Sequence, residues 1–205
     1  QDAGDFDSQI VPVSVPQRRG EAVVVSRDEH PRAGTTMENL AKLKPVFKDG
    51  GSVTAGNSAG INDAAAAVVV MSAERAAAEG LTPRLRWVGR GVSGVDPSIM
   101  GIGPVPSTRK VLAKTGMSID DLDQIELNEA FASQALYVIR ELGIDIEKTN
   151  VNGSGISLGH PVGATGAIMT VKLMEEMTRR DQQRGLVTMC VGGGQGVSTI
   201  FERIN

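Results

Sequence analysis

The sequence contains very little cysteine and histidine. One cysteine, Cys190, and two histidines, His30 and His160, stand among 205 residues. A single thiol excludes an internal disulfide framework and a metal site built from several cysteines, and it is typical of a reducing compartment. Because His, Cys and Asp residues do not recur at ligand spacing, we expect no bound metal.

The chain also lacks a long apolar run and a marked excess of one charge. Twenty-one Lys and Arg residues against 24 Asp and Glu residues leave a formal charge of −3. A nucleic acid or an anionic membrane is therefore not an expected partner. No apolar run approaches the roughly 18–20 residues of a membrane span. With 40% apolar and 22% charged residues, the composition is that of a globular protein, and we expect it in the cytoplasm.

The opening residues carry neither an initiator methionine nor the pattern of a targeting leader. The segment 1–6 is typical of the interior of a protein. We therefore expect a fragment or a processed half of a longer chain.

From residue 83 onward, strand patterns alternate with helix patterns. Gly116 and Gly143 are typical helix stops. This alternation predicts an α/β protein built around a layered sheet. The strands are expected at 85–92, 124–127, 186–190 and 197–204, and the helices at 105–115, 130–142 and 164–180.

The first 60 residues look irregular, apart from a short helix capped by Thr36. Asn62 and Asp63 are expected to cap an apolar helix that runs to about Glu79 and is buried on several sides. The best domain boundary follows this helix, near residues 81–83.

The segment 89–94 matches the G-x-G-x-x-G pattern of dinucleotide-binding loops and follows a predicted strand. That function requires a helix that opens at the third glycine and holds the pyrophosphate. Here the next predicted helix begins only near residue 105. The pattern is therefore interpreted as a strand end with turns.

Ten of the 25 glycines fall in two windows, 153–166 and 185–196, which also contain His160 and Cys190. Glycine is favoured where backbone approaches a ligand, so the two windows indicate a catalytic site with a general acid/base and a thiol. The alternatives are a histidine in a turn and a buried structural thiol. Asn128, at a strand–helix junction, either caps the helix or points into a cleft. His30 lies in a polar stretch that we expect to be solvated.

At these residues the sequence resembles the thiolase family of acetyl-CoA acetyltransferases and 3-ketoacyl-CoA thiolases. Weaker similarity runs through 54–57 and 96–104, and the variant GSGISLGHP is similar to that of bacterial β-ketothiolases with broad short-chain specificity. The segments that carry the resemblance are NEAF at 128–131, NGSGISLGHPVGATG at 152–166 and CVGGGQG at 190–196.

The resemblance implies a catalytic role for three residues. Cys190 matches the base that removes an α-proton from acetyl-CoA. His160 matches the histidine that activates the nucleophilic cysteine and lines an oxyanion hole, in which Asn128 positions a water. A cysteine base would need a pKa lowered by a neighbouring dipole or cation.

Further matches imply the contacts of the substrate. The backbone N–H of Gly192 matches an oxyanion donor, and Met100 and Phe131 match acyl-pocket residues. Arg32 matches a residue near the CoA nucleotide. Ser58 matches only approximately a serine along the pantetheine, because this chain has Ser-Ala-Gly where the family usually has Ala-Ser-Gly.

The family uses two cysteines, and the single one here matches the second. The resemblance thus implies the C-terminal half of the layered α-β-α-β-α thiolase fold, a mixed sheet flanked by helices. Residues 1–61 would end the CoA-contacting loop domain, 62–82 would be the closing helix of the N-terminal domain, and 83–205 the C-terminal domain with the catalytic loops.

The implied activity is that of an acetyl-CoA C-acetyltransferase, with acetyl-CoA and acyl-CoA as substrates and no cofactor. The half chain would be inactive alone, would need the missing N-terminal half or a companion chain, and would assemble as a homo-oligomer, a dimer or a tetramer. Alternatives are a non-catalytic CoA- or lipid-binding module, a structural subunit, and a ketoacyl synthase relative. The synthases usually have a histidine where Asn128 stands.

Overall fold

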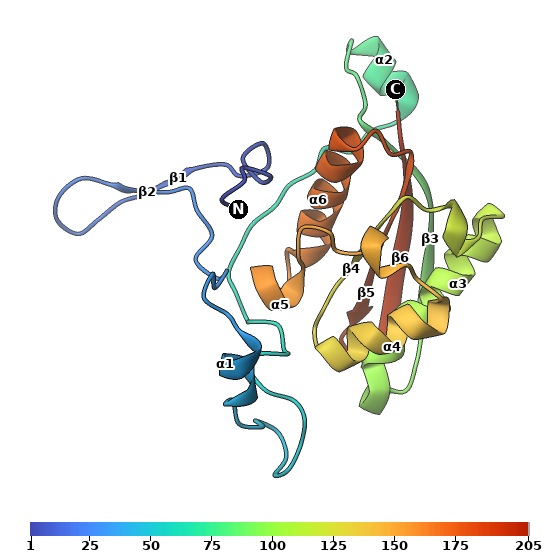
Figure 1. The fold of residues 1–205 in the computed structure, drawn as a ribbon. Coiled ribbons are helices and arrows are strands. Elements are labelled where there is room, and N and C mark those ends of the chain that lie inside the picture. The colour runs from blue at the N-terminus through green and yellow to red at the C-terminus, as the bar shows by residue number, and fades with distance from the viewer. Residues whose placement is uncertain (205) are drawn as a thin grey trace.

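A four-stranded mixed sheet forms the centre of the computed structural model, which describes residues 1–204 (Figure 1). Its strands are β3 (Leu85–Gly94), β4 (Gln124–Leu127), β5 (Arg184–Val191) and β6 (Gln195–Arg203), in the order β3-β6-β5-β4. β6 is antiparallel to both of its neighbours, whereas β4 and β5 are parallel. The expected α/β architecture with a mixed sheet is thus confirmed.

Helices cover both faces of this sheet (Figure 1). Helices α3 (Pro104–Thr115) and α4 (Ala132–Leu142) share one apolar cluster with Leu186 and Ile200. Helix α6 (Thr165–Arg179) packs with Val187 in a second cluster. Because successive strand residues point to opposite faces, the neighbours Leu186 and Val187 serve different layers.

Glycines end two of these helices as the sequence predicts. Gly116 follows α3 with φ 67°, and Gly143 follows α4 with φ 63°. Both adopt the left-handed conformation that glycine reaches without steric strain. The short elements between the long ones are η1 (Pro97–Ile102), η2 (Ile119–Asp121), η3 (Ile146–Lys148) and α5 (Gly155–Leu158).

The segment 89–94 lies inside β3, and Gly94 is the last residue of that strand. A Cβ atom on Gly91 would stand 2.1 Å from the carbonyl oxygen of Ser107 in α3. The glycine therefore serves close helix–strand packing. The segment is strand to its last residue, so the expected turns are wrong, and no helix opens at Gly94.

The N-terminal segment is irregular, as predicted. A hairpin of β1 (Val13–Val15) and β2 (Val23–Val25) projects from it (Figure 1). Helix α1 (Met37–Ala41) follows Thr36, whose side chain accepts from the backbone N–H of Asn39. The start of the chain contacts α6, where Asp5 pairs with Arg179.

The prediction of a helix from Asn62 to about Glu79 is wrong for most of these residues. Only α2 (Ala73–Ala78) is helical, and the run before it carries no regular structure. Residues 64–70 are exposed, with Val69 at 87% and Val70 at 84%. Most helical stability comes from packing an apolar face, and β-branched residues weaken the helix further. This unpacked run therefore forms no helix.

Across residues 1–204, none of the helices has the length and apolar content that crossing a membrane requires.

Candidate functional site

The parallel pairing of β4 and β5 brings two predicted site residues to one edge of the sheet. Asn128 directly follows β4, and its backbone N–H donates to the carbonyl of Thr188 in β5 at 3.0 Å. Cys190 lies two residues beyond Thr188 on that strand. Since adjacent parallel strands end at the same edge, Asn128 and Cys190 both belong to it.

His160 reaches Asn128 from the loop between α5 and α6. The Nδ2 atom of Asn128 lies 3.4 Å from Nε2 of His160, and Nδ1 of the same ring lies 2.7 Å from Oγ1 of Thr165. The Thr165 hydroxyl donates its only proton to the carbonyl of Pro161 at 2.8 Å. Nδ1 of His160 must therefore carry the proton that it shares with Thr165, which leaves the lone pair on Nε2.

Burial lowers the pKa of His160 below its ordinary value. Desolvation disfavours the charged imidazolium, so the ring is neutral near pH 7. A neutral ring with a lone pair on Nε2 can accept a proton there. Thr165, which the sequence reading overlooked, is the residue that sets this tautomer, and its only sequence signal was its place five residues after His160.

Cys190 is a buried free thiol at the end of β5. Burial raises the pKa of this thiol above its ordinary value, and a hydrogen bond involving its own backbone opposes the rise. The lowered pKa that a thiolate base would need is therefore not found here. The physical reason is desolvation, which favours the neutral thiol.

Asn128 has a fully buried side chain whose Oδ1 atom finds no hydrogen-bond partner among residues 1–204. Beside it lies a cavity of about 20 Å³, lined also by Gly155, Thr165 and Lys172. Such a volume is enough for one water molecule. The cavity and the orphaned oxygen are what a water-holding asparagine requires.

Gly192 lies exposed in the turn between β5 and β6. The next two residues, Gly193 and Gly194, have φ of 84° and 85°. This turn keeps backbone uncovered beside Cys190.

The structure brings together two of the four residues expected to contact the substrate. Ser58 forms an antiparallel bridge with Phe131, and its hydroxyl donates to the carbonyl of Thr54 at 2.8 Å. Phe131 is 36% exposed. Met100 is half-buried in η1, and Arg32 is exposed on the N-terminal segment.

Sequence reasoning also missed a buried ion pair behind the His160 loop. Lys172 of α6 donates to Glu126 of β4 at 2.7 Å and to the carbonyl of Gly153 at 2.5 Å. Burial raises the pKa of Glu126, while the Lys172 ammonium opposes the rise. The sequence signal was a lysine on the apolar face of a predicted helix.

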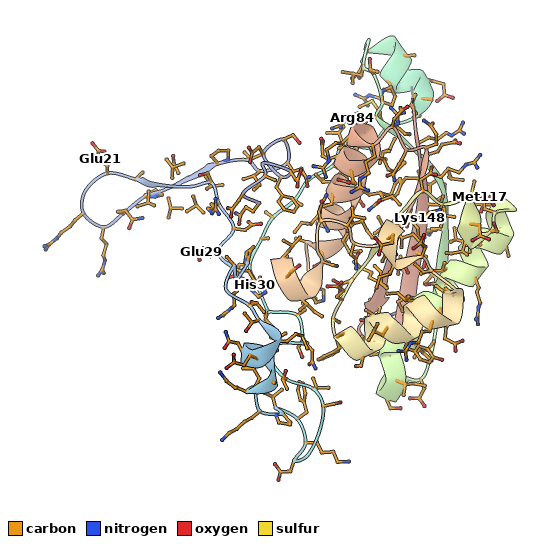
Figure 2. All side chains as sticks on the ribbon, viewed as in Figure 1. Glu21, Glu29, His30, Arg84, Met117 and Lys148 are labelled. Carbon is orange, nitrogen blue, oxygen red and sulfur yellow. The ribbon has the colours of Figure 1, made fainter. Side chains whose placement is uncertain are left out.

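His30 is not simply solvated, contrary to the sequence interpretation. The residue is half-buried, and its Nε2 atom lies 3.2 Å from the carbonyl of Ile156 in α5. Figure 2 labels it where the N-terminal segment passes α5. Within residues 1–204, His, Cys, Asp and Glu side chains form no group of three or more that could hold a metal ion.

Comparison with known families gives two matches that cover almost the whole chain. The family model described as the thiolase C-terminal domain matches residues 81–203, and that of the thiolase N-terminal domain matches residues 1–74.

Curated relatives are similar over the same length. An acetyl-CoA acetyltransferase of Pseudomonas aeruginosa is 55% identical over 202 residues, which are 98% of this chain and 51% of the relative. Beta-ketothiolase BktB of Cupriavidus necator is 55% identical over 203 residues, with the same two shares. The chain thus spans about half the length of the curated relatives it matches.

Solved structures have the same fold. The Bacillus anthracis acetyl-CoA acetyltransferase superposes with a TM-score of 0.97 at 54% identity, over 99% of this chain and 51% of that one. Human mitochondrial 3-ketoacyl-CoA thiolase in complex with CoA gives a TM-score of 0.89 at 43% identity, over 99% of this chain and 50% of that one.

Proposed function

Because the chain belongs to the thiolase family, we propose that it supplies one half of an acetyl-CoA C-acetyltransferase. The reaction is the reversible Claisen condensation and thiolysis of short-chain 3-ketoacyl-CoA. The observation that carries the proposal is the neutral His160, with Nε2 beside Asn128 at the edge of the sheet that also holds Cys190. The names of the relatives support the reaction type.

His160 acts first as the base of the acyl transfer. Its Nε2 lone pair takes the proton of a nucleophilic cysteine supplied by the missing half, and the resulting thiolate attacks the thioester carbonyl. In the condensation step the protonated Nε2 and a water held by Asn128 donate to the enolate oxygen. Thr165 keeps the proton on Nδ1 throughout, because its hydroxyl oxygen accepts a hydrogen bond from the Nδ1–H.

We assign Cys190 as the base that removes the α-proton of acetyl-CoA. During the acyl transfer the Cys190 thiol gives its proton to the departing CoA thiolate, which leaves Cys190 as a thiolate. The α-proton of the second acetyl-CoA then moves to this sulfur, and the carbanion attacks the acetylated cysteine of the other half. Acetoacetyl-CoA forms as that cysteine leaves and takes back its proton from His160. In thiolysis the thiol returns the proton to the departing carbanion. A raised pKa favours this proton-donating form. The backbone N–H of Gly192 is assigned to an oxyanion hole.

The substrates are CoA thioesters, and we propose no resident cofactor. Arg32, Ser58, Met100 and Phe131 are the proposed contacts of the nucleotide, the pantetheine and the acyl group. The structure of a human relative with CoA supports this class of substrate. The complete enzyme would be a cytoplasmic homo-oligomer, a dimer or a tetramer.

A companion polypeptide is part of the proposal. The chain has one cysteine, and Cys190 is assigned to the base. The acylated nucleophile must then come from a second polypeptide or from a missing N-terminal half, and the 205-residue chain alone is expected to be inactive.

The second candidate is a non-catalytic thiolase-like module that binds CoA or a lipid. The single cysteine favours it if no companion chain exists. The ordered His160–Asn128 pair favours catalysis, because a binding module has no need of an imidazole whose Nε2 lone pair is held beside Asn128.

The test is reconstitution. Thiolysis of acetoacetyl-CoA is measured with the chain alone and with an added N-terminal half of the Pseudomonas aeruginosa relative. We expect no turnover alone and turnover in the mixture, which His160→Ala removes. The matched control is the same relative split into its own two halves. If that control is active and the mixed pair is not, the proposed activity is wrong, and CoA binding without turnover would favour the module.

A further inference from the structure

We propose that Asn62 and His30 are positioning residues that hold the main chain of His160 at its working place. The proposal rests on the proposed function in one respect only, the catalytic role of His160. The geometry itself comes from three segments far apart in the sequence, which meet beside α5: the loop around residue 30, residues 60–62 and residues 156–160.

Three hydrogen bonds link these segments. The Oδ1 atom of Asn62 accepts from the backbone N–H of His160 at 3.2 Å. The Nδ2 atom of Asn62 lies 3.4 Å from Nδ1 of His30. The Nε2 atom of His30 lies 3.2 Å from the carbonyl of Ile156, four residues before His160.

The direction of each bond follows from the carbonyl of Ile156. A carbonyl oxygen can only accept, so Nε2 of His30 carries a proton and donates it. In the neutral ring Nδ1 then has a lone pair, which accepts from the Asn62 amide. Because the amide nitrogen of Asn62 donates to His30, the amide oxygen faces the backbone N–H of His160. His30 thereby selects the one amide orientation that supports the catalytic loop.

The glycines beside this network allow its side chains to approach the main chain closely. A Cβ atom on Gly159 would stand 2.4 Å from Oδ1 of Asn62, and one on Gly60 would stand 2.4 Å from Cε1 of His30. Gly159 also has φ 97°, which side-chain-bearing residues rarely adopt. Ile61 forms a parallel bridge with His160, and the His160 N–H also reaches the Gly60 carbonyl at 3.0 Å. The main chain of His160 is therefore fixed from the side of residues 60–62.

The arrangement gives the two histidines of the chain opposite tautomers. His160 carries its proton on Nδ1, toward Thr165, whereas His30 carries it on Nε2, toward Ile156. Thr165 holds the ring of His160, and Asn62 holds its main chain. Together the two contacts fix the direction of Nε2.

The first test reads the tautomers directly. The chain is labelled with ¹⁵N at histidine, and long-range ¹⁵N–¹H correlation spectra are recorded near pH 8, with His30→Gln to assign the signals. We expect an Nε2–H pattern for His30 and an Nδ1–H pattern for His160. An Nδ1–H pattern for His30, or an even mixture, overturns the proposal. This outcome does not depend on turnover.

A matched pair of variants then isolates the role of Asn62. Asn62→Asp keeps an oxygen that accepts from His160 but has no N–H for His30, so we expect the His30 pattern to change while the His160 pattern stays. Asn62→Ala removes both bonds, and we expect the His160 signals to broaden or shift. If the His160 signals are unchanged in Asn62→Ala, Asn62 does not position this residue.

The reconstituted enzyme supplies the functional readout. Asn62→Ala should lower kcat for acetoacetyl-CoA thiolysis about tenfold, since small displacements of a catalytic group reduce rate strongly, with KM changed less than about twofold. Asn62→Asp should recover most of kcat. The control is Asp120→Ala, an exposed residue of η2. An equal reduction of kcat in both Asn62 variants, or an increase in KM with unchanged kcat, contradicts a positioning role. An inactive wild-type mixture beside an active split relative refutes the proposed function instead. The tautomer measurement then tests the hydrogen-bond network by itself.

Discussion

His160 and Cys190 lie in surroundings that stabilise the neutral form of each side chain. Burial lowers the pKa of His160 and raises the pKa of Cys190. A neutral imidazole that contacts Asn128 is a proton acceptor, and the protonated thiol of Cys190 on the neighbouring strand is a proton donor. The two residues therefore enter the proposed cycle with different tasks.

The raised pKa of Cys190 predicts slow alkylation at neutral pH. Only the thiolate reacts with iodoacetamide, so the rate for this single cysteine should rise with pH and reach its midpoint above 9.0, the ordinary pKa of a thiol. Mass spectrometry of the intact chain follows the modification, and the chain unfolded in guanidinium chloride is the control. A midpoint below 9.0 in the folded chain would contradict the burial argument.

Variants of the two residues should separate the half-reactions in the reconstituted enzyme. Cys190→Ser should still allow acetylation of the other half, while exchange of the acetyl-CoA methyl protons with deuterated water fails, because a serine hydroxyl is a far weaker base. His160→Ala should impair both steps, and loss of one oxyanion donor alone reduces rate about 10²–10³-fold. Both readouts are obtained by mass spectrometry. Loss of acetylation with intact exchange in Cys190→Ser would make Cys190 the nucleophile.

At the scale of elements, α6 is joined to β4 and to the loop that carries His160 by one buried charge pair. The side chains of Lys172 and Glu126 are 5% and 1% exposed. The Lys172 ammonium also binds the Gly153 carbonyl, at the start of the glycine-rich segment that carries His160. The pair thus stabilises the layer contact and the loop together.

Lys172→Met should lower the free energy of unfolding by about 3–5 kcal/mol, because Glu126 is left buried without a counter-charge. Adding Glu126→Gln should recover much of the loss, since the unpaired charge is then gone. Urea denaturation followed by circular dichroism measures both variants, with the exposed Lys44→Met as control. A single variant as stable as wild type would show that the pair contributes nothing.

At the scale of the whole molecule, the run before α2 exposes an apolar surface. Residues 64–70 are exposed, and Ile61 at their start is 95% exposed. Contiguous apolar surface of this kind is typical of an interaction site or an aggregation site. It agrees with the proposed need for a second polypeptide.

Hydrogen exchange should locate the contact with that polypeptide. Amides at 64–71 should exchange without protection in the chain alone and become protected when the N-terminal half of a relative is bound, as the run gains packing and helix. The chain alone should also be poorly soluble. Mass-detected exchange gives both states, with β5 as an internal control that is protected in each. Protection of 64–71 in the isolated chain would refute this prediction.

The sequence by itself determined the layered part of the fold. Helices α3, α4 and α6 and strands β3 to β6 lie within two residues of the expected bounds, because hydrophobic periodicity and glycine stops act locally. The motifs around Asn128, His160 and Cys190 pointed to the family. Parallel pairing of β4 and β5 explains why two of these residues share an edge.

Only the tertiary structure decided the state of the apolar run and the partners of the site residues. Residues 64–71 are apolar throughout, and a helix there needs a surface to pack on. The sequence predicts Asn62 as a helix cap, but its side chain bonds to the backbone of His160. It predicts His30 as solvated, but this ring bonds to the carbonyl of Ile156. These two contacts join residues 98 and 126 positions apart. A bond of that range depends on where the whole fold places each segment, which no local pattern encodes.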